Sequence, residues 1–126
     1  MHFAEVILAQ NPGMTLCHVS GRSTDGTEQG KVMGARVKGR AENALMKMPF
    51  KAVYNFRPAL MEPTRGQKHI KPAFRVGVAL LGPLFRTLAP GSSSTLKGLG
   101  RAMIRCVASG APKNILEVAD LNALGA

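Results

Sequence analysis

Apolar residues recur in the first part of this chain with a helical spacing and then in a short continuous run. The spacing within residues 2–10 predicts a helix, and the turn sequence Asn-Pro-Gly at 11–13 ends it. The run 14–20 is rich in β-forming residues and has a glycine on either side, which predicts a buried strand.

A second helix and a second strand are predicted after a turn-rich segment. Thr27 and Glu28 are residue types that start helices, and the amphipathic pattern continues to about Met48, where Pro49 stops it. Residues 50–56 are then predicted to form the second strand.

The remaining signals are prolines, glycines and helix caps. They predict an extended loop at 57–66, followed by a helix from Pro72 to about residue 90, which Pro83 kinks or splits. A second helix is predicted at 95–109. A strand at 114–118 and a helical turn at 119–124 complete the chain.

This order of helices and strands is typical of an α/β chain with a parallel sheet. The length of 126 residues suits one domain. Three strands leave at least one sheet edge or face uncovered, so the chain reads as part of a larger fold.

Charge narrows the class of partner. Seventeen Lys and Arg against seven Asp and Glu give a net charge of +10, which favours an anionic partner. The basic residues are scattered from Arg22 to Lys113, and Tyr54 is the only tyrosine. Without a basic patch and interleaved aromatics, we expect no nucleic-acid binding.

The cysteines and histidines predict neither a disulfide nor a metal site. Cys17 and Cys106 lie in apolar segments, where a free thiol behaves as a small hydrophobe, so we expect a reduced, cytoplasmic protein. The three histidines are isolated, and no Cys or His pair has the spacing of metal ligands.

No segment reads as a signal peptide or a membrane span. The apolar run 76–85 is too short to cross a bilayer. We interpret it as a core or partner-facing helix, with contact at a membrane surface as a minor alternative because Arg75 and Arg86 flank it.

Four stretches carry a resemblance to a known family. They are 17–21 (CHVSG), 24–45 (TDGTEQGKVMGARVKGRAENAL), 50–63 (FKAVYNFRPALMEP) and 81–110 (LGPLFRTLAPGSSSTLKGLGRAMIRCVASG). In this order they resemble the C-terminal half of an atypical short-chain dehydrogenase/reductase of the NAD(P)-binding, epimerase-like branch. The resemblance implies a partial Rossmann-like, doubly wound parallel sheet with a helical C-terminal part, residues 1–66 ending the core and 67–126 lying on the substrate side.

The same resemblance assigns roles to particular residues. Ser20, at the end of a strand, would hydrogen-bond a substrate oxygen. Lys38 would bind the ribose hydroxyls of NAD or NADP and lower the pKa of a proton donor. The turn beside the nicotinamide would be formed by Arg57, Pro58, Ala59 and Leu60.

Two departures from the family pattern bear on activity. The family's catalytic tyrosine stands four residues before the lysine, and here that position is Gly34. The glycine-rich loop that binds the pyrophosphate after a first strand is also missing. We therefore expect a fragment of an NAD(P)-dependent oxidoreductase that is not catalytically competent alone.

Structural interpretations stand beside these roles. Lys38 can be a surface lysine, Ser20 a cap for the following turn, and Arg57 the partner of Glu62. At the level of function, the alternatives are an interaction module that pairs through its open sheet edge with a second copy or an N-terminal half-domain, and a basic protein that binds anions or membrane surfaces.

Overall fold

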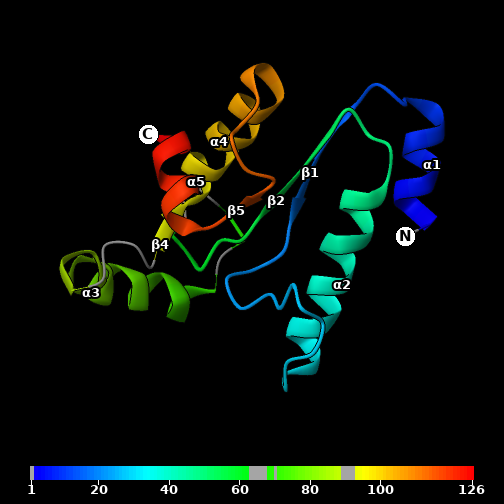
Figure 1. Cartoon of the computed structure of the whole chain (residues 1–126). Helices are drawn as coiled ribbons and strands as arrows, with labels where there is room; N and C mark the ends of the chain where they lie inside the picture. The colour runs from blue at the N-terminus through cyan, green and yellow to red at the C-terminus, as the bar shows by residue number, and fades with distance from the viewer. Residues whose placement is uncertain (1, 63–67, 70, 89–92) are drawn as a thin grey trace.

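The computed structural model describes residues 2–62, 68, 69, 71–88 and 93–126 (Figure 1). Its helices are α1 (His2–Gln10), α2 (Met33–Lys47), α3 (Pro72–Leu88), α4 (Leu96–Ser109) and α5 (Val118–Gly125). Its strands are β1 (Thr15–Val19), β2 (Ala52–Phe56), β3 (Leu60–Glu62), β4 (Ser93–Thr95) and β5 (Ile115–Leu116).

The main sheet has three parallel strands in the order β1-β2-β5. Helices α1 and α2 lie on one side of it and α4 and α5 on the other (Figure 1). A second, two-stranded sheet pairs β3 with β4, also in parallel. The prediction of an α/β chain with a parallel sheet is confirmed.

Strand β2 forms the centre of the structure because its two faces belong to two hydrophobic cores. Val53 joins Ala4, Leu45 and Phe50 under α1 and α2. The other core, under α4 and α5, is formed by Tyr54, Phe56, Leu99, Ala102, Cys106, Leu116 and Leu121. A strand buried on both faces is typical of a parallel sheet covered by helices.

Helix α2 begins at Met33, so the predicted start at Thr27 and Glu28 was wrong. The carboxylate of Asp25 accepts hydrogen bonds from the backbone N–H groups of Thr27 and Gly30, at 3.0 and 2.6 Å. Glu28 takes a left-handed φ of 61°, which a helix does not allow. These local bonds hold a loop where the sequence pattern indicated helix.

Other elements also differ from their predictions. Strand β1 is half-buried rather than buried, because it lies at a sheet edge. Strand β3 forms inside the predicted loop 57–66, of which 63–66 lie outside the described residues, and β4 was not predicted. Helix α3 runs through Pro83 without splitting. Helix α5 is longer than one turn.

Other predictions are confirmed. Helix α1 has the predicted bounds, α4 starts behind a Thr95 side chain that accepts a hydrogen bond from the Gly98 backbone N–H at 2.9 Å, and both cysteines are free thiols. In the part of the chain that the structure describes, no helix is long and apolar enough to cross a membrane.

Gly39 is the point at which α2 meets the 21–32 loop. A Cβ at this position would lie 1.7 Å from the backbone oxygen of Asp25, so the Gly39→Ala substitution must push helix and loop apart. We expect a loss of about 2 kcal/mol in the free energy of unfolding, measured with urea.

Gly34→Ala on the same helix is the matched control. No described atom lies within 4 Å of a Cβ there, so stability should stay unchanged or rise by up to ~1 kcal/mol. Equal stability of the two variants would contradict the close packing of the loop on α2.

Candidate functional site

Three polar side chains meet at the carboxyl edge of the main sheet. Each directly follows the last residue of a strand: Ser20 follows β1, Arg57 follows β2 and Glu117 follows β5. The strands are in register there, because Val19 pairs with Phe56 and Phe56 with Leu116. In open parallel sheets this edge is where ligands bind.

Arg57 is held by two carboxylates. Its Nε and Nη2 donate to the two oxygens of Glu42 on α2, at 3.0 and 2.6 Å, and its Nη1 donates to Glu117 at 2.9 Å. The Ser20 hydroxyl donates to the same Glu42 oxygen that Nε reaches.

This network is buried, which decides its electrostatics. The Glu42 side chain is fully buried, and the Arg57 side chain is 11% exposed. Burial raises the pKa of Glu42, but the hydrogen bonds from Arg57 and Ser20 and the charge of Arg57 hold that pKa below its usual value overall. Hydrogen bonding to Glu42 raises the pKa of Arg57 despite burial. Both groups are therefore charged at neutral pH.

A second polar pair crosses the same sheet one layer deeper. His18 on β1 faces Asn55 on β2 in register, with 3.0 Å between His18 Nδ1 and Asn55 Oδ1. Asn55 is fully buried, and its Nδ2 has no hydrogen-bond partner among the described residues. The sequence analysis missed this pair, although an asparagine between Tyr54 and Phe56 is unusual in a central strand.

A pocket of about 620 Å³ opens beside this edge. It is lined by Ser20, Gly21, Arg22, Ser23, Lys38, Pro58 and Ala59. Lys38 extends from α2 across the end of β1, since a Cβ on Gly21 would lie 3.2 Å from its Nζ. The Arg22 backbone N–H donates to the Pro58 carbonyl at 3.1 Å and joins the two loops that form the pocket wall.

The structure brings together four of the six predicted site residues around this pocket: Ser20, Lys38, Pro58 and Ala59. Arg57 adjoins them, but its guanidinium is occupied by Glu42 and Glu117. Leu60 begins β3, and its side chain is not described.

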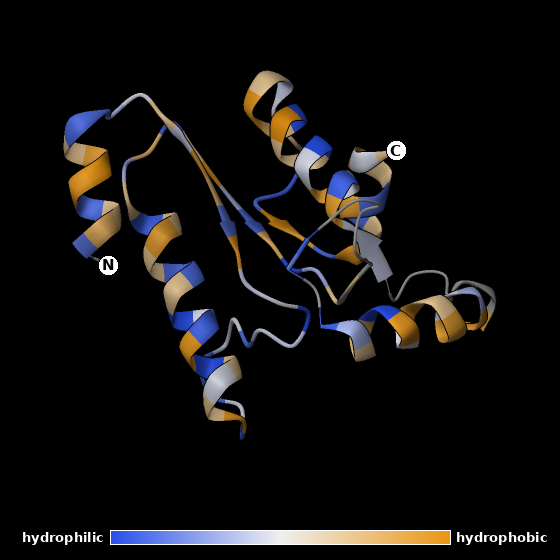
Figure 2. Cartoon of the chain, turned by 180° about the vertical axis from the view of Figure 1, so that it is seen from behind, coloured by the Kyte–Doolittle hydropathy of each residue, from blue (hydrophilic) through white to orange (hydrophobic). Residues whose placement is uncertain are grey.

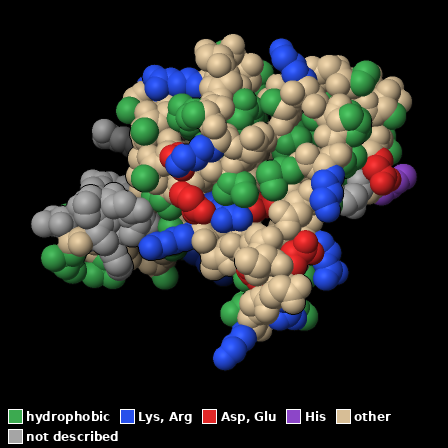
Figure 3. Space-filling model, in the orientation of Figure 1, with side chains coloured by type: hydrophobic (Ala, Val, Ile, Leu, Met, Phe, Trp, Pro, Cys, Tyr) green, Lys and Arg blue, Asp and Glu red, His purple; other side chains and the backbone are tan. Residues whose placement is uncertain are grey.

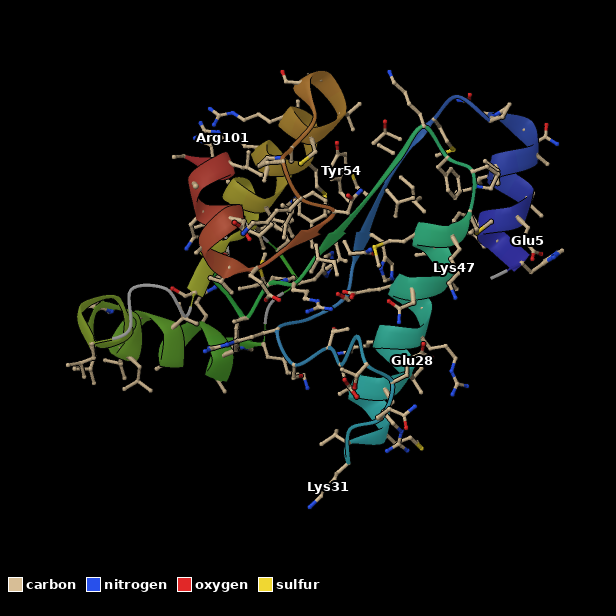
Figure 4. The ribbon with its side chains drawn as sticks, viewed as in Figure 1. Glu5, Glu28, Lys31, Lys47, Tyr54 and Arg101 are labelled. Carbon is tan, nitrogen blue, oxygen red and sulfur yellow. The ribbon has the colours of Figure 1, made fainter. Side chains whose placement is uncertain are left out.

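The two residues relevant to a proton donor lie apart from each other. Gly34 stands one helical turn before Lys38 and offers no side chain. Tyr54 points toward α4 (Figure 4), where its hydroxyl accepts a hydrogen bond from the Ala111 backbone N–H at 3.2 Å. Its role is therefore structural.

A comparison with protein families and with curated proteins found no match to this chain. Within the described ranges, no group of three or more His, Cys, Asp or Glu side chains could hold a metal ion.

Replacing Glu42 tests the buried network. Glu42→Gln removes the negative charge that is paired with the buried Arg57 guanidinium. We therefore expect a loss of about 3 kcal/mol in the free energy of unfolding. Glu5→Gln is the control, because Glu5 is exposed on α1 (Figure 4) and should cost less than ~0.5 kcal/mol. A loss for Glu42→Gln as small as this would contradict the network's role.

The effect of Glu42→Gln on the free energy of unfolding should depend on pH. The pKa of Glu42 is lower in the folded chain than in the unfolded chain, so its stabilisation is complete above the unfolded value of about 4.3. That stabilisation is lost as the pH falls through the folded value. The difference in unfolding free energy between wild type and Glu42→Gln should therefore shrink below about pH 4. A difference independent of pH would show that folding leaves the pKa of Glu42 unchanged.

Proposed function

We propose that this chain forms the nicotinamide-ribose side of an NAD(P) site, in a protein of the short-chain dehydrogenase/reductase type and its epimerase-like branch. The observation that carries the proposal is the pocket at the carboxyl edge of the parallel sheet, where Ser20, Lys38 and the Pro58–Ala59 turn converge. On this proposal the three-stranded sheet is the C-terminal part of a doubly wound, Rossmann-like domain.

The residues of the pocket fit this part of the cofactor. Pockets that bind small molecules hold about 300–1,000 Å³, and this one falls in that range. The Lys38 ammonium can donate hydrogen bonds to ribose hydroxyls. Because the Ser20 hydroxyl donates to Glu42, its oxygen is left to accept a hydrogen bond from a bound group. When bound, the cofactor supplies hydride transfer.

The same residues indicate binding without independent catalysis. Gly34 cannot donate a proton to a developing oxyanion, and no Gly-x-Gly-x-x-Gly sequence directly follows one of the described strands of the main sheet. We propose that a separate βαβ unit supplies the pyrophosphate loop by pairing with β1, which among the described strands pairs only with β2. The free thiols of Cys17 and Cys106 support a location in the reducing cytoplasm.

A second candidate function is an interaction module without cofactor chemistry. The half-buried edge strand β1 favours it, since such an edge can pair with another chain. In this case β1 would bind a second copy or a half-domain, and the pocket would stay empty of nucleotide.

Titration with NADH and NADPH, followed by nucleotide fluorescence, tests the proposal. We expect binding in the micromolar range that Lys38→Ala weakens about tenfold, because hydrogen bonds to charged groups contribute about 1.5–3 kcal/mol. Lys47→Ala is the matched control, since Lys47 lies at the far end of the same helix (Figure 4) and does not line the pocket.

Two results would speak against the cofactor site. Equal weakening by both lysine substitutions would mean that only overall charge matters. No binding by a folded chain that self-associates would favour the interaction module.

A further inference from the structure

We propose that α3 is an amphipathic docking helix that lies on the surface of a bilayer containing anionic phospholipids. This inference is independent of the cofactor site. It rests on the direction in which α3 turns its apolar side and on the charge of the sequence around it.

Helix α3 turns its apolar side away from the protein. Gly82 is buried, whereas Leu80 and Leu84, two residues to either side, are exposed. Two residues correspond to about 200° around a helix, so the leucines lie opposite the buried glycine. Among the described side chains of the helix, the exposed large apolar ones are Phe74, Val76, Leu80, Leu81, Leu84 and Leu88.

The helix stands out from the three layers of the main fold. Figure 1 shows α3 beyond the sheet and its covering helices, and Figure 2 shows hydrophobic residues along much of its length. Neither hydrophobic core of the described residues includes a residue of α3. An apolar helix face of this extent is typical of a surface that contacts a partner.

The charge of the surrounding sequence selects an anionic partner. Between Glu62 and Glu117 the sequence holds nine Lys or Arg and no Asp or Glu. Lys68 and Lys71 lie exposed just before the helix. A second copy would bring the same positive charge against itself, whereas phosphatidylserine headgroups would attract it.

The dimensions of the helix fit attachment to one bilayer surface. With 17 residues α3 is shorter than the roughly 20 residues of a typical membrane span. Leucine with phenylalanine on one side is typical of helices that lie at the headgroup boundary. The membrane alternative for residues 76–85 thus gains support from a feature that the sequence pattern does not give, namely the outward direction of the apolar side.

Vesicle sedimentation tests this proposal. The full chain is mixed with vesicles of phosphatidylcholine, with or without phosphatidylserine, and the bound fraction is measured. We expect binding to the vesicles with phosphatidylserine, much weaker binding to the neutral ones, and loss of binding as salt is raised.

Two double variants distinguish membrane binding by α3 from nonspecific binding by exposed apolar residues elsewhere in the chain. Leu80→Ser with Leu84→Ser should weaken binding about tenfold or more. Ile104→Ser with Val107→Ser on α4 should leave it unchanged. The two pairs are matched in exposure, at 73% and 53% on α3 and 70% and 55% on α4. Because all four side chains are exposed, the variants should fold, which circular dichroism checks.

Three results would overturn the proposal. The first is no binding of the wild-type chain to vesicles with phosphatidylserine. The second is equal binding by the wild type and the α3 variant, which would reduce the effect to charge alone. The third is a dimer in analytical ultracentrifugation that the α3 variant abolishes, without vesicle binding, which would make α3 an interface between copies.

Discussion

The ion pair between Arg57 and Glu42 is the interaction on which the carboxyl edge of the sheet depends. It joins the end of β2 to α2, and through Ser20 and Glu117 it reaches the ends of β1 and β5. A buried charge is costly unless it is paired, so each member requires the others in place. Lys38 stands one turn before Glu42 on the same helix, and the pairing of Glu42 thereby directs Lys38 over Gly21.

This arrangement separates the charges of the buried network from the charge that lines the pocket. Arg57 was expected beside the cofactor, but its guanidinium donates hydrogen bonds to two carboxylates. The residues of this turn that line the pocket are Pro58 and Ala59. Lys38 is exposed, yet it lies at the pocket rather than on the outer side of the helix. The sequence pattern of a helix does not distinguish a surface lysine from one that lines a pocket. For Lys38, the position beside the carboxyl edge of the sheet makes this distinction.

The few carboxylates of the chain serve mainly its internal contacts. Asp25 holds the loop before α2, Glu28 pairs with Arg40, and Asp120 pairs with Lys113. With the acidic groups used in this way, the remaining surface is strongly positive. Figure 3 shows the Lys and Arg side chains spread over the visible face rather than gathered into one patch. Such a surface suits an extended anionic partner.

Four features follow from local periodicity and capping alone. These are the helix at 2–10, the end of α2 before Pro49, the Thr95 cap and the parallel α/β order. Ser20 and Arg57, which follow the first two strands, were named as site residues through the family resemblance, and the parallel sheet brings them to one edge.

The pairing of residues that are distant in the chain depends on the tertiary fold. Segments far apart in the chain come together when β3 pairs with β4 and when Arg57 pairs with the buried Glu42. Local sequence periodicity does not predict such contacts. The start of α2 was decided by the bonds of Asp25, which compete with helix formation. The direction of the apolar side of α3 likewise depends on where the rest of the protein lies.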